Sequence, residues 1–396
     1  MTISAPIYLD YNATTPVDPS VVDALLPYLR EHFGNPSSDH AYGYVAHAAI
    51  ERAREQVAAL LGAGPGEIVF TGGGSEANNL ALNGVIAALR ERGDSRRGDT
   101  RRRDHDPGDH VITTAIEHPA VLQPLRGLEA RGLRLTILPV DGDGRIDPQQ
   151  VVDAITPRTI LVSVMHANNE VGTLQDLRAI ADAAHARGAL VHTDAAQSVG
   201  KIPTRVDDLD VDLLSIAGHK LYAPKGVGAL YVRSGVRLAP HIRGAGHERG
   251  LRAGTENVPY IVGLGAAADL AARRLDVFPA QLRALRDALH KGILAHVPDA
   301  QLNGHPDERL PNTLNLGFPG VNAAALLARI RDRVACSTGS ACHAGHAEPS
   351  GVLLAMGRDP ALAAAALRLS LGAWTTAEEV AEAASVIGAA VGEERR

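Results

Sequence analysis

Short apolar runs alternate with longer amphipathic runs from about residue 45 to residue 235, and this alternation is the strongest constraint on the fold. The short runs have the length and the β-branched content of buried strands, whereas the longer runs have helical spacing. Strands that are separated by helices tend to become parallel neighbours in a sheet covered on both faces. The sequence therefore predicts an α/β protein with a mainly parallel sheet. We expect strands at 67–70, 110–113, 133–140, 159–165, 189–194, 211–216 and 228–232, and helices at 75–90 and 174–188.

The pattern changes past about residue 260, where long Ala/Leu-rich helices are separated by short strands such as LPNTLNLGF at 310–318. This change predicts a second, smaller α+β domain. Residues 90–110 are also unusual, because they are almost wholly polar and hold seven Arg against six Asp or Glu. Mixed charge without apolar residues cannot support a packed structure, which favours a solvated, poorly ordered insertion over a docking arm for an acidic partner.

Composition narrows the class of protein further. The net charge of −6 gives no general attraction to nucleic acid or to anionic membranes. No segment approaches ~18 uninterrupted apolar residues, so we expect no membrane helix, and the first residues do not resemble a secretory signal. Two cysteines, Cys336 and Cys342, cannot build a disulfide framework, so we expect a cytoplasmic protein.

A glycine run, TGGGSEANN at 71–79, passes from an expected strand directly into an expected helix. Glycines let backbone N–H groups approach an anion, and a helix N-terminus adds free donors and partial positive charge. The run matches neither the Walker A pattern nor G-x-G-x-x-G. A bound phosphate and a tight turn with no ligand are equally compatible with this run alone.

Two charged residues lie at or just past the ends of expected strands, at what should be the same edge of the sheet. Lys220, in SIAGHK at 215–220, is one of only four lysines, and Asp194 lies in HTDAAQ at 192–197. Ligands of open α/β sheets gather at the carboxyl ends of the strands. A desolvated lysine can form a Schiff base, although a lone lysine is usually a solvated charge. Asp194 could pair with a protonated ring nitrogen, or it could simply cap a helix. A phosphate cradle, a reactive lysine and such an aspartate together meet the requirements of pyridoxal phosphate.

Two further side chains follow strands on the same side. His118, in IEHPAV at 116–121, has a flat imidazole that suits stacking on a ring and titrates near neutral pH. Asn169, in HANNEVG at 166–172, can hydrogen-bond a ring hydroxyl or a carboxylate.

The motifs then match a known family along nearly the whole chain. YLDYNATTP, FGNPSS, TGGGSEANN, HTDAAQSVGK, GHKLYAPKGVGALYVR, GHERGLRAGTEN, LPNTLN and STGSAC…EPS occur in order, and the chain resembles the cysteine desulfurases. These belong to the class V aminotransferase group of fold type I pyridoxal-phosphate enzymes. The resemblance implies a large cofactor domain at 16–260, a small domain formed by 1–15 and 261–396, and a homodimer with active sites at the interface.

The resemblance also implies roles for individual residues. Lys220 would carry pyridoxal phosphate, Asp194 would pair with the pyridine nitrogen, and Gln197 would bind the ring hydroxyl. His118 would stack on the ring and transfer protons. Asn169 and Arg368 would bind the carboxylate of L-cysteine, a task that suits a guanidinium. The phosphate would be held by Gly74, Ser75 and His219, with Thr255 reaching in from the partner subunit.

Cys342 matches the family nucleophile, on a loop at 337–346 that we expect to be mobile. Its thiolate would take the sulfur of the substrate and pass it to an acceptor protein, and His343 or the cofactor could favour the thiolate. Cys336 ends an apolar run and is expected to pack in the core. A metal site built from Cys336, Cys342, His343 and His346 would match no zinc spacing.

The chain departs from the family at three places. Ala217 replaces a serine that commonly contacts the phosphate, Ala373 replaces an arginine, and Cys342-His343 resembles the selenocysteine lyases. Pro119, after the stacking histidine, is instead typical of desulfurases. The sequence therefore favours a cysteine desulfurase, with a selenocysteine lyase, an aminotransferase of the same fold and a non-catalytic binding protein as alternatives.

Overall fold

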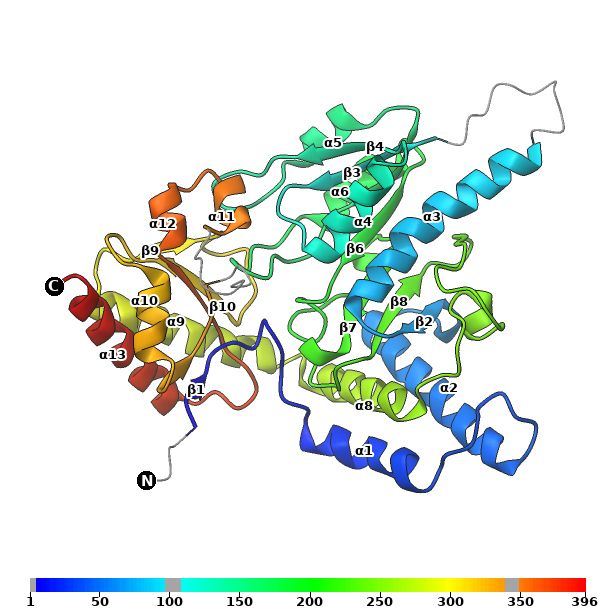
Figure 1. The fold of residues 1–396 in the computed structure, drawn as a ribbon, viewed down its shortest axis with the longest axis horizontal. Coiled ribbons are helices and arrows are strands. Elements are labelled where there is room, and N and C mark those ends of the chain that lie inside the picture. The colour runs from blue at the N-terminus through cyan, green and yellow to red at the C-terminus, as the bar shows by residue number, and fades with distance from the viewer. Residues whose placement is uncertain (1–4, 97–107, 339–348) are drawn as a thin grey trace.

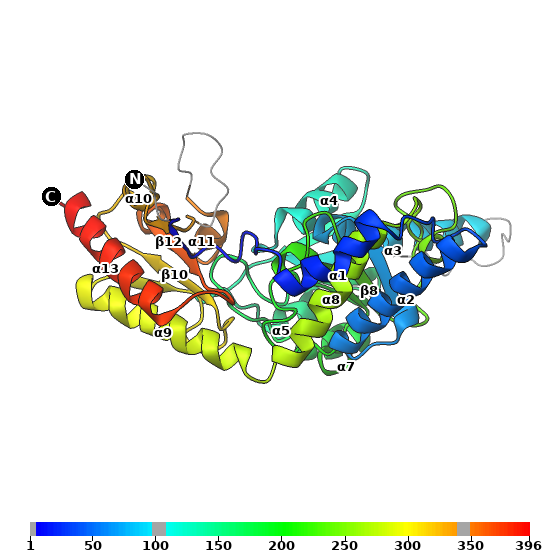
Figure 2. The ribbon, with the colours of Figure 1, turned by 90° about the horizontal axis from the view of Figure 1, so that it is seen from below.

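The computed structural model of the chain describes residues 5–96, 108–338 and 349–396. Two bodies of packed secondary structure lie side by side in Figure 1. The body on the right contains the larger sheet, and the body on the left carries both ends of the chain. Figure 2, turned by 90°, shows the same two bodies along an elongated molecule.

The larger body is built on a seven-stranded sheet with the order β2-β8-β7-β6-β5-β3-β4. Its strands are β2 (Ile68–Thr71), β3 (His110–Thr114), β4 (Arg134–Leu138), β5 (Thr159–Ser163), β6 (Leu190–Asp194), β7 (Leu213–Ala217) and β8 (Gly228–Val232). Strand β8 pairs antiparallel with both β2 and β7, whereas the pairs from β7 to β4 are parallel. This confirms the mainly parallel sheet that the sequence predicts.

Helices cover both faces of this sheet, as predicted, because alternate strand residues point to opposite sides. In β2, Ile68 and Phe70 join one apolar core, while Val69 between them joins the other. The first core includes α2 (Ala41–Leu61), α6 (Leu177–His185) and α8 (Val258–Arg274), and the second includes α3 (Gly74–Arg96) and α4 (Pro119–Glu129). The remaining helices of this body are α1 (Pro19–Arg30), α5 (Pro148–Ala154) and α7 (Val206–Leu209).

The smaller body has its own apolar core around an antiparallel sheet with the order β12-β10-β9. Strand β1, near the start of the chain, pairs in parallel with β11, which brings the first residues into this body. Its elements are β1 (Ile7–Tyr8), β9 (Gln301–Asn303), β10 (Thr313–Gly317), β11 (Val334–Ala335), β12 (Ala366–Ser370), α9 (Phe278–His296), α10 (Ala323–Ile330), α11 (Gly351–Ala355), α12 (Pro360–Ala364) and α13 (Ala377–Glu394). Helix α8 packs with the larger body and α9 with the smaller one. The domain limits at 15–16 and 260–261 stay predictions.

Two expectations about helices need correction or restriction. The helix predicted over 75–90 continues to Arg96, so the beginning of the polar segment 90–110 is helical, which its Arg and Glu content allows. Residues 97–107 of that segment lie outside the described residues. The helix predicted over 174–188 is shorter, because Asp176 caps its start and accepts from the backbone N–H of Ala179. No helix in the described ranges is long and apolar enough to cross a bilayer.

Candidate active site

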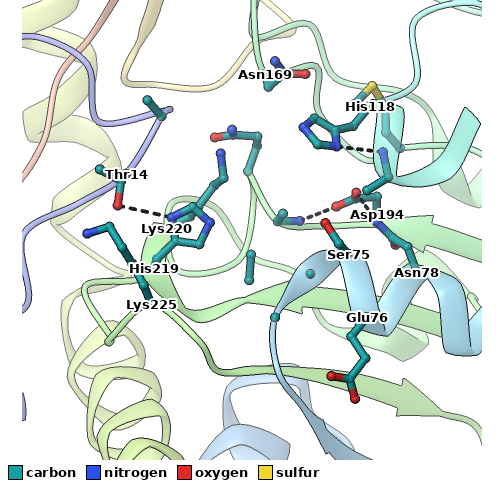
Figure 3. Close-up of a pocket in the computed structure, with 18 of the residues that line it drawn as sticks. Thr14, Ser75, Glu76, Asn78, His118, Asn169, Asp194, His219, Lys220 and Lys225 are labelled. Atoms are coloured by element: carbon teal, nitrogen blue, oxygen red, sulfur yellow. Dashed lines mark hydrogen bonds between the residues drawn. The ribbon is translucent and has the colours of Figure 1, made fainter. Parts of the chain in front are cut away.

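A cavity of about 740 Å³ lies at the carboxyl ends of the parallel strands, next to the start of α3 (Figure 3). Four strands, β3, β5, β6 and β7, run in the same direction, so the segments that follow them meet at this edge. Eight of the predicted site residues line this cavity: Gly74, Ser75, His118, Asn169, Asp194, Gln197, His219 and Lys220.

Lys220 ends a short 3₁₀ turn, Gly218–Lys220, directly after β7. Its Nζ donates to the carbonyl oxygen of Asn12 at 2.5 Å. Burial lowers the pKa of Lys220 to about 8, and Arg368 adds to this effect, while Asp194 and Asp10 oppose it. The chain thus holds an amine near the point at which it loses its proton, which is what attack on a carbonyl requires.

Asp194 ends β6 and is nearly buried, and its carboxylate is fixed from two sides. Asn78 Nδ2 donates to Oδ2 at 2.7 Å, and the backbone N–H of Ala196 donates to Oδ1 at 3.0 Å. Donors to both oxygens fix the direction of the carboxylate. This carboxylate lines the same cavity as Lys220.

The glycine run forms the turn between β2 and α3 at the edge of the cavity. Gly73 has φ of +147°, a conformation that favours glycine, and α3 starts at the next residue. A Cβ on Gly228 of β8 would lie 2.7 Å from the carbonyl carbon of Gly73, so glycine at 228 lets the turn pack closely on β8. The free N–H groups of the first turn of α3 are suited to an anion.

Two neighbours modify this anion site. The methyl group of Ala217 would lie 3.0 Å from a Cβ placed on Gly74, so an apolar group stands where the family commonly has a hydroxyl. Glu76, in the first turn of α3, forms an ion pair with Arg252, with 2.9 Å between Oε1 and Nε, and its Oε2 accepts from the N–H of Gly72. The labelled Glu76 side chain points away from Lys220 in Figure 3. Arg252 thus neutralises the charge of Glu76 beside the glycine turn.

The two predicted histidines differ in their environment. His118 caps α4, and its Nδ1 accepts from the N–H of Ala120 at 3.1 Å. Burial and the Lys220 amine lower the pKa of His118, whereas Asp194 opposes the shift. Nδ1 is thereby held as an acceptor, which leaves Nε2 to carry the proton of the neutral ring. His219 Nδ1 lies 3.2 Å from Thr14 Oγ1, and burial, with the lysines around it, lowers its pKa to about 4. His219 is therefore neutral.

Arg368, in β12, does not line the cavity but contacts its wall. Its Nη1 donates to the carbonyl oxygen of Asn169 at 3.3 Å, and its Nη2 pairs with Asp10 Oδ1 at 2.7 Å. Its buried Nε has no hydrogen-bond partner among the described residues. Asp10 thus neutralises part of the Arg368 charge, and no feature of the sequence indicated this ion pair.

The remaining predicted residues lie away from the cavity or outside the described part of the chain. Thr255 is exposed and does not line the cavity of its own chain. Cys342, His343 and His346 lie outside the described residues, so the predicted nucleophile is a matter of sequence alone. Cys336 packs against the core of the smaller body, as predicted, and burial raises its pKa to about 12. The Cys336 thiol therefore stays protonated and unreactive.

Besides Asp10, sequence reasoning missed two residues that organise the site. Asn12 is fully buried, its carbonyl oxygen accepts from both Lys220 and Gln197, and its side chain bonds to Thr313. Asn78 anchors Asp194. Both lie within motifs quoted above, but neither has a charge or a spacing that identifies its role.

The fold and the cavity define a class of protein: an α/β enzyme whose sheet edge presents an amine, a carboxylate and an anion-binding turn together. The family model "Aminotransferase class-V" matches residues 7–96 and 97–382. The cysteine desulfurase IscS of Anaeromyxobacter dehalogenans is 46% identical over 97% of this chain and 92% of its own length. Among solved structures, a NifS-like protein has a TM-score of 0.88 and 35% identity, covering 98% of this chain and 100% of its own. SspA in complex with cysteine has a TM-score of 0.79 and 39% identity, covering 93% of this chain and 99% of its own.

The chain belongs to the class-V aminotransferase family. Members of this family are pyridoxal-phosphate enzymes, and the likeness to NifS-like structures confirms the predicted fold class, fold type I. The predicted resemblance to cysteine desulfurases is confirmed as well.

Proposed function

We propose that this chain is a cysteine desulfurase, which uses pyridoxal phosphate to convert L-cysteine into L-alanine and leaves a persulfide on Cys342. The observation that carries the proposal is the position of Lys220 and Asp194 in one cavity at the start of α3. The similarity to cysteine desulfurases supports the choice of reaction. The alternative of a non-catalytic binding protein does not account for an amine whose pKa is lowered to about 8.

The residues present fit the cofactor. A cavity of about 740 Å³ is in the range of small-molecule sites and can hold a phosphorylated pyridine ring. The turn at Gly73 and Gly74 would receive the phosphate, Asp194 would face a ring nitrogen, and Lys220 would attach to the aldehyde. When bound, pyridoxal phosphate supplies an electrophilic carbon and a ring that accepts electrons from breaking bonds.

The chain's own groups would then divide the work. Asp194, fixed by Asn78 and Ala196, would stabilise a positive charge on the ring nitrogen. Gln197 would donate toward a ring oxygen. His118 exchanges protons through Nε2, because its Nδ1 accepts from the backbone.

The substrate carboxylate would bind between Asn169 and Arg368. Arg368 Nη1 donates to the carbonyl oxygen of Asn169, so the guanidinium charge lies beside this part of the cavity although Nη2 is paired with Asp10. The ion pair with Asp10 also fixes the guanidinium plane, which lowers the entropy lost on binding.

The sulfur step belongs to Cys342. Its thiolate attacks the sulfur of the bound cysteine, an S–S bond forms, and the C–S bond breaks with its electron pair left on carbon. That carbon takes up a proton, alanine leaves, and the sulfur stays on Cys342 until an acceptor thiol removes it.

The test compares two variants of the same residue type. Cys342→Ala should abolish sulfide release from cysteine in the presence of a reductant, while Cys336→Ala, which alters a core position, should keep the parent kcat. Sulfide release by Cys342→Ala at the parent rate would exclude the assigned nucleophile.

The Cys342-His343 pair in the sequence favours one second candidate, a selenocysteine lyase. Turnover of cysteine and selenocysteine by the same preparation separates the two. We expect comparable use of both substrates, whereas a lyase would barely use cysteine.

We also propose a homodimer. Phe33 and Tyr42 are exposed and their rings stack with centroids 5.5 Å apart, and Tyr44, two residues after Tyr42, is exposed too. Exposed aromatic clusters are typical of protein interfaces. Thr255, which is exposed and outside its own cavity, could then serve the partner's site. Light scattering after size exclusion tests this proposal, and a monomer that is fully active would refute it.

The sulfur acceptor and the compartment are proposals of the same kind. We propose an acceptor protein of iron–sulfur cluster assembly or thio-modification, supported by the IscS relative, and a cytoplasmic location, supported by the low cysteine content. Transfer of labelled sulfur from Cys342 to candidate acceptors would test the first proposal.

A further inference from the structure

Lys201 is a second buried lysine close to the cavity, and no role described above uses it. Its side chain lies in the turn after β6, and only 3% of the residue is exposed. Its Nζ donates to Gln197 Oε1 at 3.0 Å. No ion pair with a carboxylate is found for Lys201 within the described ranges. A buried ammonium without an acid is costly, so its retention calls for a reason.

The backbone directs this lysine inward. The N–H of Lys201 donates to the carbonyl oxygen of Ser198 at 2.9 Å, which closes the turn. Gly200 has φ of +76°, and a Cβ there would lie 2.1 Å from Leu221 Cδ1. Leu221 follows Lys220, so the turn that bears Lys201 packs tightly against the segment that bears the reactive amine.

Gln197 connects the two lysines. Its Nε2 donates to the carbonyl oxygen of Asn12 at 3.0 Å, and the same oxygen accepts from Lys220 Nζ. Lys201 Nζ donates to Oε1 of Gln197, and the carbonyl oxygen of Asn12 can only accept. Lys201 and Asn12 therefore specify the same orientation of the Gln197 carboxamide, with Oε1 toward Lys201 and Nε2 toward Asn12.

This orientation matters because Gln197 lines the cavity. Nε2 carries two hydrogens, and the bond to Asn12 uses one of them. The other is left for an acceptor in the cavity. In the opposite orientation the amide would present an oxygen and repel an anionic ring oxygen.

We infer that Lys201 is a positioning residue, which holds the Gln197 carboxamide with its N–H toward an anionic oxygen of the cofactor. This inference rests on the proposed function. The inference also gives a reason for the burial of Lys201. Its hydrogen bond to Gln197 offsets part of the free energy that burying the amine costs.

A double-mutant cycle tests the inference with the holoenzyme. Lys201→Met keeps the length of the side chain and removes the donor, Gln197→Ala removes the amide, and Lys291→Met, at an exposed lysine of α9, is the control. The readouts are the rate at which the cofactor's visible absorbance is lost on dilution, and the melting temperature. We expect Lys201→Met to release the cofactor about tenfold faster in the parent background, and less than twofold faster in Gln197→Ala. Lys291→Met should match the parent.

Equal effects of Lys201→Met in both backgrounds would overturn the inference, because they would show a structural role that does not pass through Gln197. No effect in either background would overturn it as well. If Lys201→Met does not fold, Gln197→Glu gives the answer: its carboxylate has no N–H to present, so cofactor release must accelerate. Unchanged release from Gln197→Glu would contradict the inference.

The outcomes for the two proposals differ. A parent protein that shows no visible absorbance with added cofactor refutes the proposed function, and this inference with it. A coloured parent without the expected coupling between Lys201 and Gln197 refutes this inference alone.

Discussion

Two neighbouring regions bury charged groups in opposite ways. Next to β2, Arg54 of α2 meets Glu248 in two parallel N–H···O bonds of 2.8 Å, and Glu248 also accepts from the N–H of Phe70. At the cavity, Lys220 donates to a backbone carbonyl, and Lys201, buried behind Gln197, donates to an amide instead of a carboxylate.

The paired charges of Arg54 and Glu248 make their region rigid, whereas the unpaired lysines make theirs reactive. A matched buried pair keeps both charges and fixes the elements that it joins, here α2, β2 and the turn at Glu248–Gly250. Burial without a hydrogen-bonded carboxylate lowers the pKa of Lys220 to about 8 and that of Lys201 to about 7. In this range an amine can exchange protons near neutral pH.

The largest effect is expected at the unmatched amine. Lys220→Ala should lower kcat for sulfur release by at least about 10³-fold, because it removes the nucleophile itself. Lys291→Ala, at an exposed position, should keep the parent rate. Steady-state assays with cysteine measure both, and activity of Lys220→Ala within tenfold of the parent would contradict the account.

The matched pair should respond through stability instead. Arg54→Met leaves Glu248 buried without its cation, which should lower the free energy of unfolding by about 3–5 kcal/mol. Arg126→Met breaks an exposed pair with Glu129 and should cost less than about 1 kcal/mol. Denaturant titrations measure the free energy of unfolding of both variants. Equal losses would show that the buried pair stabilises the protein no more than the exposed pair.

Asp194 tests whether a fixed negative charge is needed in the cavity. Asp194→Asn keeps the size of the side chain and removes the charge, and we expect kcat/KM to fall about 10²-fold. The visible absorbance of the bound cofactor should remain, since Lys220 is intact. A parent-like kcat/KM would show that the ring nitrogen needs no anion.

Glu117 extends the comparison to a buried acid without a cation. Burial raises its pKa to about 8, and its buried Oε2 has no partner among the described residues. Because the folded protein holds this proton while the unfolded chain releases it near 4.5, stability should fall as pH rises from about 4.5 to about 8. Glu117→Gln removes this titration. The melting temperature of the variant minus that of the parent should therefore increase as pH rises. A constant difference between pH 5 and pH 8 would contradict the assigned pKa.

The fold was largely predictable because its strands are buried on both faces and read as short apolar runs. Ile68, Val69 and Phe70 illustrate this, since each is apolar although they face two different cores. The helix end at Arg96 was not predictable, because polar residues with high helix propensity also suit a solvated loop.

The site was predictable where a residue's chemistry is rare in the chain. Lys220 stands out among four lysines, and eight predicted residues line one cavity. Asn12 acts through its backbone carbonyl, and Lys201 through an amide that another residue presents. The contact of Asn12 with Lys220 joins positions 208 residues apart. Lys201 and Gln197 are only four residues apart, but the role of this pair depends on the burial of both side chains, which no local pattern in the sequence encodes.

The attachment point of the cofactor tests the central claim most directly. Pyridoxal phosphate is added to the protein, the adduct is reduced with borohydride, and the peptides are mapped by mass spectrometry. The account predicts a reduced pyridoxyl label on the peptide that contains Lys220. A label on Lys201, Lys225 or Lys291 in its place, or no label at all, would contradict it.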